Sequence, residues 1–320
     1  MRIVLMGTRD IAVPALYALL GRPESGWEVV GVVTQPDRPS GRSKLRAASP
    51  AKVIAQSAGI PVFQPESWRD DAAVVWLREM APDVGIVASY AQLLPRRVLR
   101  IPAAGWLNIH PSLLPRHRGP SPVAASILAG DTVTGVTIIK LAPAMDAGPV
   151  IKQITVPIRP DDTNRSLTAR LGDLGSQLLM TVLDDWVAGT ITAQPQDNEN
   201  ATYSRLLTRQ DGLIDWNLPA SDLERHVRAY DPWPGTFTYL QGRRLSILSA
   251  RALPTEAEAP PGTVQGLRIV REQKALLVAT GDKLLAVYRL QLEGRKPLAA
   301  EEFARGQGSI IGDRLTTEGR

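Results

Sequence analysis

The sequence contains no cysteine and only three histidines, His110, His117 and His226. The absence of cysteine excludes disulfide bonds and thiolate metal sites. Three scattered imidazoles do not provide the closely spaced ligands that are typical of a zinc site. We therefore predict a protein that binds no metal.

Long apolar runs are also absent. The first twenty residues are interrupted by Gly7, Arg9, Asp10 and Pro14, which argues against a signal peptide or a membrane span. We expect a cytoplasmic protein with no membrane partner. The same stretch has a single glycine and lacks G-x-G-x-x-G, so a dinucleotide-binding site and a dehydrogenase activity are not indicated.

The length and the charge restrict the class of protein further. A chain of 320 residues is too long for one ordinary core and predicts two domains. Its net charge of +5 suits a polyanionic partner, although solvated surface charge explains a mild excess equally well.

The N-terminal part alternates short apolar segments with amphipathic ones. This alternation predicts a doubly wound parallel sheet of the Rossmann-like α/β class. Two further segments, 134–142 and 149–158, are expected to form a strand pair, and a long helix that ends at Gly189 follows them. The strands of the parallel sheet are predicted at residues 2–6, 29–34, 61–63, 83–90 and 105–110.

The C-terminal part has a different pattern. We predict a first domain at 1–189, a linker at 190–207 and a second domain at 208–320. Ser221 and Glu224 fit a capping box that opens a helix. The many short strands that follow indicate a small β-barrel, with an exposed loop at 252–262.

The stretch L-N-I-H at 107–110 places an amide and an imidazole on one face of a strand, because side chains alternate across a strand. Ligands of an open parallel sheet bind beyond the carboxyl ends of its strands, where Asn108 and His110 would lie. Asp146, in the loop A-M-D-A-G-P, would complete a set suited to acyl transfer. Asn108 can donate to a developing oxyanion, His110 can move a proton, and Asp146 can hold the charged imidazole.

Structural roles remain open for these three residues. On spacing alone, an Asn and a His placed like Asn108 and His110 more often have a structural role at the end of a strand than a catalytic one. An Asp placed like Asp146 is more often a turn residue than a catalyst. No side-chain nucleophile is needed if the substrate brings its own amine. Ser112 has no G-x-S-x-G context that would make it one.

The segment after His110 is stiffened by prolines. Pro111 and Pro115 bracket Ser112, Leu113 and Leu114. A rigid backbone with free N–H and C=O groups could hydrogen-bond a flat heterocycle, so we predict that this segment forms the rim of a pocket.

Several motifs together resemble the 10-formyltetrahydrofolate-dependent formyltransferases. The motifs are N-I-H-P-S-L-L-P-R-H-R-G, then G-D-x-x-T-G-V-T-I, and M-D-A-G-P-V-I. The resemblance extends from about residue 2 to 315 and includes Q-P-D-R-P-S-G-R, I-P-V-F-Q-P and P-W-P. It implies a Rossmann-like formyl-transfer domain followed by a C-terminal barrel that resembles an OB-fold.

The resemblance also implies roles for individual residues. The formyl donor would be 10-formyltetrahydrofolate, and the acceptor would be the α-amine of methionyl initiator tRNA, for translation initiation. Nothing in the sequence demands more than a monomer, which is the state we expect. The implied catalytic residues are Asn108, His110 and Asp146. The implied folate contacts are Ser112, Leu113, Leu114 and Pro115. The implied tRNA contacts are four basic residues of the loop at 37–46, namely Arg38, Arg42, Lys44 and Arg46.

Two alternatives stay open. A formyltransferase that acts on glycinamide ribonucleotide or an amino sugar nucleotide would share the N-terminal motifs, although the glycinamide enzyme would lack the C-terminal barrel and neither needs the basic loop. A catalytically inactive RNA-binding protein could retain the fold. Intact Asn108, His110 and Asp146 argue against that reading.

Overall fold

The computed structural model describes residues 1–8, 11–39, 46–307 and 309–319. The chain divides into two compact units, which are described separately. Unit 1 comprises residues 1–122, 132–158 and 166–205, and unit 2 comprises residues 123–131, 159–165 and 206–320. Of the linker predicted at 190–207, residues 190–205 belong to unit 1 and residues 206–207 to unit 2.

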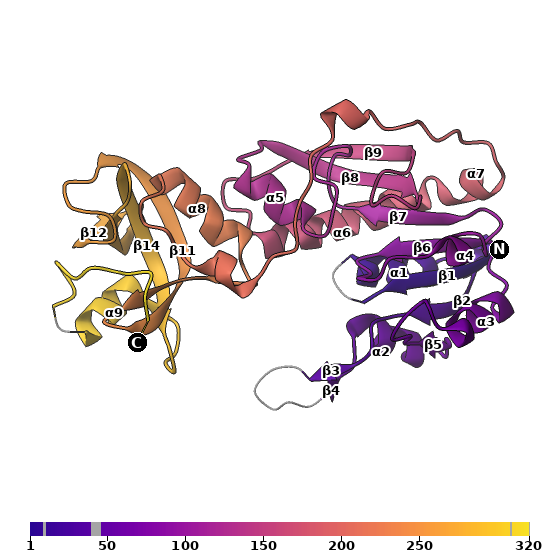
Figure 1. Ribbon diagram of the computed structural model, residues 1–320, viewed down its shortest axis with the longest axis horizontal. Coiled ribbons are helices and arrows are strands. Elements are labelled where there is room, and N and C mark those ends of the chain that lie inside the picture. The colour runs from indigo at the N-terminus through magenta and orange to yellow at the C-terminus, as the bar shows by residue number, and fades with distance from the viewer. Residues whose placement is uncertain (9–10, 40–45, 308, 320) are drawn as a thin grey trace. The chain divides into compact units, whose positions relative to one another are not determined.

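Unit 1 is built on a seven-stranded sheet of order β5-β2-β1-β6-β7-β8-β9 (Figure 1). The first five strands pair in parallel, as predicted, and β8 and β9 extend the sheet as the expected antiparallel pair. The strands are β1 (Arg2–Gly7), β2 (Glu28–Val33), β5 (Val62–Phe63), β6 (Val84–Ala88), β7 (Trp106–His110), β8 (Val133–Lys140) and β9 (Val150–Pro157). A separate two-stranded ladder joins β3 (Arg38–Pro39) to β4 (Arg46–Ala47).

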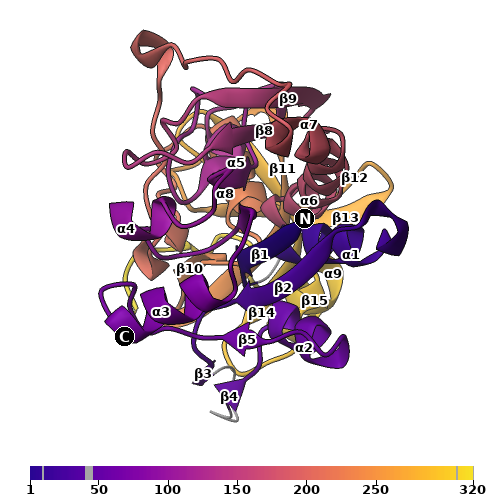
Figure 2. The same cartoon turned by 90° about the vertical axis from the view of Figure 1, so that its right-hand side faces the viewer.

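Helices cover both faces of this sheet (Figure 2). On one face, Val74 and Leu77 of α3 pack with Trp106 of β7 in a shared apolar core. On the other face, α6 lies so close to β7 that a Cβ at Gly175 would come within 2.6 Å of Ile109 Cγ2. The helices are α1 (Ala12–Leu20), α2 (Pro50–Ser57), α3 (Asp71–Glu79), α4 (Arg96–Leu99), α6 (Asn164–Met180) and α7 (Leu183–Val187), with 3-10 turns at Pro23–Ser25 and Asn198–Asn200.

Unit 2 contains an antiparallel sheet of order β10-β11-β14-β13-β12, with β15 beside β14. Residues near the C-terminus bridge its two ends, because Thr316 pairs with Tyr239 of β10 and Arg314 pairs with Thr263 just before β12. This closure agrees with the predicted small barrel. The strands are β10 (Thr236–Leu240), β11 (Arg243–Glu256), β12 (Val264–Val270), β13 (Gln273–Ala279), β14 (Lys283–Leu292) and β15 (Leu298–Ala299). The helices are α5 (Pro122–Leu128), α8 (Ala220–Ala229) and α9 (Ala300–Gly306), with a 3-10 turn at Arg209–Gly212.

Three expectations for the second domain are wrong in detail. Ser221 is not the helix cap, because α8 already begins at Ala220 after Pro219, and Ala220 N donates to Asp282 Oδ1 at 2.8 Å. Glu224 instead accepts from Arg251 Nη1 at 3.0 Å. The loop expected at 252–262 starts as strand, because β11 continues to Glu256 along β14.

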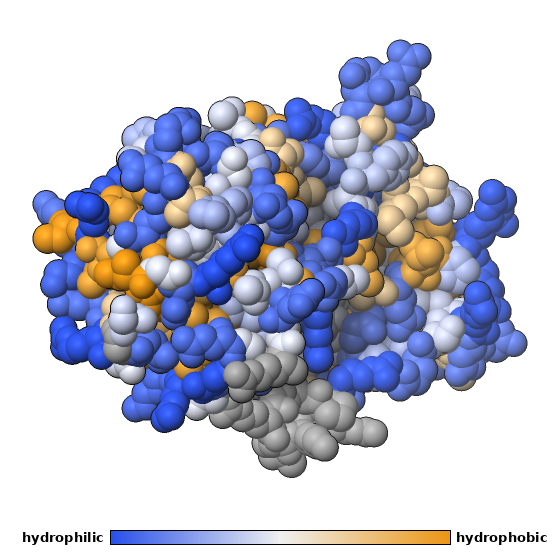
Figure 3. Space-filling model, turned by 60° about the vertical axis from the view of Figure 1, so that its left-hand side comes forward, coloured by the Kyte–Doolittle hydropathy of each residue, from blue (hydrophilic) through white to orange (hydrophobic). Residues whose placement is uncertain are grey.

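The face of the molecule shown in Figure 3 is mostly hydrophilic, with apolar patches between the polar residues. Across the described ranges, no helix is both long enough and apolar enough to cross a membrane. Within the same residues, no three His, Cys, Asp or Glu side chains are grouped so that they could hold a metal ion.

Candidate active site

Strand β7 presents Asn108 and His110 on the same face, as the alternation predicts. Ile109 points the opposite way, toward Gly175 of α6. Both polar side chains are largely buried, with 9% of Asn108 and 4% of His110 exposed. Strand β7 lies next to β6, which adjoins β1 at the point where the strand order reverses. The pair therefore lies near the edge where open parallel sheets bind ligands.

The loop between β8 and β9 brings Asp146 to this pair. Asp146 Oδ1 lies 3.6 Å from His110 Nδ1 and accepts from Asn108 Nδ2 at 3.4 Å. Asp146 adopts a left-handed backbone conformation, with φ of 50°. The three residues selected from the sequence thus come together, although 36 positions (146 − 110) separate the last two in the chain.

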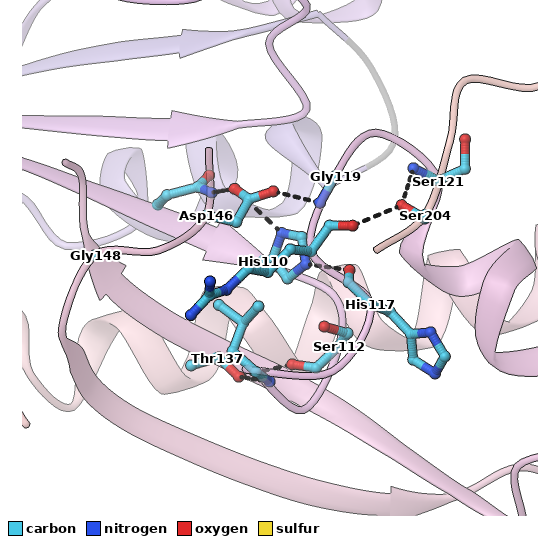
Figure 4. Close-up of polar contacts among 12 residues, drawn as sticks. His110, Ser112, His117, Gly119, Ser121, Thr137, Asp146, Gly148 and Ser204 are labelled. Atoms are coloured by element: carbon cyan, nitrogen blue, oxygen red, sulfur yellow. Dashed lines mark hydrogen bonds and ion pairs between the residues drawn. The ribbon is translucent and has the colours of Figure 1, made fainter. Parts of the chain in front are cut away.

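The loop after β7 holds both members of the imidazole–carboxylate pair (Figure 4). His110 Nε2 contacts the carbonyl oxygen of His117 at 3.1 Å, and Gly119 N donates to Asp146 Oδ2 at 2.7 Å. Because a carbonyl can only accept, Nε2 carries a proton. In the neutral ring, Nδ1 then has a lone pair that faces the carboxylate. The pair can therefore take up one proton between Nδ1 and Oδ1.

Burial determines the resting charge of His110. Burial lowers the pKa of the imidazole below its usual 6.5, and the Asp146 carboxylate and the His117 carbonyl oppose this shift without reversing it, while the His117 side chain adds to it. The resting ring is therefore neutral at neutral pH. The sequence-based role of Asp146, to hold a charged imidazole, stays a prediction, and it applies to the protonated pair. Positive charge would develop only when the pair takes up a proton.

We expect His110 to titrate below pH 6.5, and the Asp146→Asn substitution to lower its pKa further by removing the main attractive charge. NMR of imidazole carbons measures this directly, since the chain has only three histidines. The unfolded chain binds more protons below pH 6.5 than the folded one. The contribution of His110 to the free energy of unfolding therefore falls as the pH drops from 6.5 to the folded pKa. A wild-type His110 pKa above 6.5 would contradict this account.

In the proline-bracketed segment, several of the backbone groups that were expected to bind a heterocycle are already hydrogen-bonded within the protein. Ser112 O accepts from Thr137 Oγ1 at 2.6 Å, and Leu114 N donates to the same hydroxyl at 3.2 Å. Leu114 O accepts from Gln153 Nε2 at 3.1 Å. Ser112 is fully buried, whereas Leu113 and Pro115 are partly exposed. Folate contact by Ser112, Leu113, Leu114 and Pro115 stays a prediction, and apolar contact through Leu113 and Pro115 fits the structure best.

Sequence reasoning missed the residues that support the site. Thr137 and Gln153, on β8 and β9, fix the segment after His110 and hydrogen-bond each other at 2.7 Å. Arg118 and Gln196 hold the neighbouring loops. Thr137 could have been noticed as a polar residue within the apolar run V-T-I-I. Gln196 gave no such signal, because its segment has no periodicity.

The predicted basic loop is only partly described. Arg38 is exposed and forms an ion pair with Glu66 at 3.1 Å. In the β3–β4 ladder, Arg46 is the backbone partner of Pro39, and Ala47 is the partner of Arg38. Arg42 and Lys44 lie outside the described residues. The structure therefore does not test these four residues as tRNA contacts.

Two family models match the chain. The model described as "Formyl transferase" matches residues 1–183, and the one described as "Formyl transferase, C-terminal domain" matches residues 206–308. Among curated relatives, methionyl-tRNA formyltransferase from Roseiflexus castenholzii is 48% identical over 98% of this chain and 99% of its own. The enzyme of the same name from Herpetosiphon aurantiacus is also 48% identical, over 97% and 99% respectively.

Solved structures share the fold at lower identity. HypX from Aquifex aeolicus in complex with tetrahydrofolic acid has a TM-score of 0.64 at 20% identity; the match covers 97% of this chain but only 47% of that one. The sugar 3N-formyl transferase WlaRD has a TM-score of 0.64 at 17% identity, and the match covers 92% of this chain and 99% of that one. Glycinamide ribonucleotide transformylase 1 from Symbiobacterium toebii, with a TM-score of 0.52 at 24% identity, covers 62% of this chain and 94% of its own. Both halves of this chain thus match the same family, and the chain belongs to the formyl transferases.

Proposed function

We propose that this chain transfers a formyl group from 10-formyltetrahydrofolate to the α-amine of methionyl initiator tRNA, which yields formylmethionyl-tRNA and tetrahydrofolate for translation initiation. The observation that carries the choice of acceptor is the 48% identity to methionyl-tRNA formyltransferases over nearly the whole of both chains. The convergence of Asn108, His110 and Asp146 supplies groups suited to this chemistry.

The proposed roles follow from the geometry. The neutral amine forms a bond to the formyl carbon, and the bond from that carbon to N10 of the folate breaks. Asn108 Nδ2 donates to the formyl oxygen while negative charge develops on it. The His110–Asp146 pair takes up the proton that the amine loses and can return it to the departing N10. The imidazolium formed in this way would sit beside the same developing charge.

The extent of the match to enzymes named for small acceptors bears on the choice of acceptor only in part. The match to the glycinamide ribonucleotide enzyme covers 62% of this chain, so more than a third of this chain has no counterpart in that structure. The sugar formyl transferase covers 92%, so two-part chains also occur with a small acceptor. Acceptor choice therefore has to be measured.

The experiment compares formyl transfer from 10-formyltetrahydrofolate to three acceptors, namely methionyl initiator tRNA, glycinamide ribonucleotide and an amino sugar nucleotide. We expect transfer to the tRNA alone. Transfer to a small acceptor alone would overturn the proposed acceptor and leave the formyl-transfer chemistry in place. We also propose that the chain acts as a monomer in the cytoplasm, which sedimentation in solution and cell fractionation would test.

The Arg42→Ala substitution is expected to raise the KM for methionyl-tRNA roughly 10-fold, because a phosphate contact contributes mainly electrostatic attraction. The salt dependence of tRNA binding should become shallower by about one phosphate contact. The KM for folate should not change. The matched control is Arg38→Ala. Because Arg38 already pairs with Glu66, its loss should raise the KM for methionyl-tRNA less than the loss of Arg42 does. If Arg42→Ala raised the KM for methionyl-tRNA and the KM for folate equally, the loop would have a structural role.

A further inference from the structure

Residues 194–204 lie against the two loops that form the candidate active site. Gln194 and Val150, the first residue of β9, exchange two backbone hydrogen bonds of 2.7 Å. Further along, Thr202 Oγ1 accepts from His117 N at 2.8 Å, and Ser204 N donates to Arg118 O at 2.7 Å. The segment is thus bonded at one end beside the Asp146 loop and at the other end to the loop that follows His110.

Gln196 connects these two loops through a single amide. Its Nε2 donates to the carbonyl oxygens of Asp146 and Gly148, both at 2.7 Å. Its Oε1 accepts from Arg118 Nε at 3.1 Å and from Arg118 Nη2 at 2.8 Å. The amide therefore uses both of its N–H groups and both oxygen lone pairs.

The Asp146 loop needs such support. Asp146 has a positive φ of 50°, which a residue with a side chain adopts at some cost. Gly148 passes so close to β8 that a Cβ there would lie 1.8 Å from Lys140 O. The two bonds from Gln196 bracket this tight turn. They fix the backbone from which the carboxylate reaches His110 and Asn108.

Arg118 fixes Gln196 in turn. Its side chain is buried and also contacts Asn198 Oδ1 at 2.8 Å and Tyr203 Oη at 3.3 Å. Its neighbours in the chain, His117 and Gly119, bind His110 and Asp146 directly. A buried guanidinium with rigid neighbours gives the glutamine amide a defined orientation.

We propose that Gln196 is a positioning residue that sets the distance between the Asp146 carboxylate and His110, and that Arg118 orients it. Gln196 does not touch the reacting atoms. Its role is to keep the proton-accepting pair assembled, so its loss would slow the chemical step and leave substrate binding intact. The kinetic consequence rests on the proposed function, whereas the geometry of the pair can be measured without any substrate.

The test compares two variants of the full chain. Gln196→Met keeps the length of the side chain but removes both bonds to the Asp146 loop and one acceptor of Arg118. Asn198→Ala removes another acceptor of Arg118 and leaves the Asp146 loop bonded. Kinetics, thermal midpoints and NMR titration of the imidazoles are recorded for both. The titratable groups that act on His110 are Asp146 and the side chain of His117.

We expect Gln196→Met to lower kcat roughly 10- to 100-fold with both KM values unchanged, as for a misplaced catalytic group. The pKa of His110 should also fall, because the carboxylate that raises it moves away. Asn198→Ala should keep kcat within about two-fold and leave the His110 titration unchanged.

Wild-type kcat and an unchanged His110 titration in Gln196→Met would overturn the proposal. Equal losses in the two variants would also overturn it, because the effect would then pass through Arg118 alone. If the wild-type chain formylates none of the acceptors, the proposed function fails, and the His110 titration still decides the role of Gln196.

Discussion

Replacing Asp146 by asparagine is expected to lower kcat roughly 100- to 1000-fold, the range typical for loss of a group that stabilises the transition state or moves a proton. The asparagine amide has the same shape and can still accept from Gly119 N. It has no charge, however, and cannot take up a proton beside His110 Nδ1. Single-turnover formyl transfer to methionyl-tRNA measures the effect on the chemical step, and equilibrium titration checks that folate still binds.

The chain offers a matched control for this substitution. Asp83 lies just before β6, at the amino ends of the parallel strands and so away from Asn108 and His110. It also accepts a backbone N–H through its carboxylate, from Arg2 at 2.7 Å. Asp83→Asn should change stability slightly and kcat hardly at all. Turnover near the wild-type level in Asp146→Asn would exclude Asp146 from proton transfer and charge stabilisation.

Replacing His110 by alanine is expected to cause a loss of similar size, roughly 100-fold or more in kcat. The imidazole is the neutral half of the pair and the only part that can become a cation beside the developing oxyanion. Its removal leaves the Asp146 carboxylate with Asn108 and Gly119 as partners but without a second site for the proton. The rate should also lose its dependence on pH below 6.5.

His226 serves as the control for His110. It is half-buried, and desolvation likewise lowers its pKa, but it belongs to α8 of unit 2. His226→Asn should lower the thermal midpoint and leave kcat unchanged. If His226→Asn and His110→Ala slowed transfer equally, the effect of His110 would be one of folding and its assigned role would be wrong.

The fold could be predicted largely from local patterns. Apolar segments that end in glycine or a polar residue located the strands of unit 1 to within one or two residues. The signal is strongest for the central strands β1, β6 and β7, which are buried along almost their whole length. The capping-box pattern at Ser221 is a local signal, whereas the start of α8 is set by a tertiary hydrogen bond from Ala220 N to Asp282. The closure of the second sheet by residues 314–316 has no sequence signature.

The candidate site could be predicted only in its central residues. Strand alternation was sufficient to pair Asn108 with His110, and the small residues after Asp146 marked its loop. The residues that hold this site contact it from distant parts of the chain. Gln196 follows Asp146 by 50 positions and lies in a segment without periodicity, so local pattern could not connect the two. The neutral resting state of His110 also depends on burial, which spacing does not reveal.

The bridges at Arg314 and Thr316 bear on the order in which the two units can fold during synthesis. Every residue of unit 1 precedes residue 206, so all the residues of its sheet and of the Gln196 contacts are synthesised before most of unit 2 is translated. The sheet of unit 2 cannot join its two ends until residue 316 has left the ribosome. The unit that carries the chemistry can therefore be complete before its partner unit is closed.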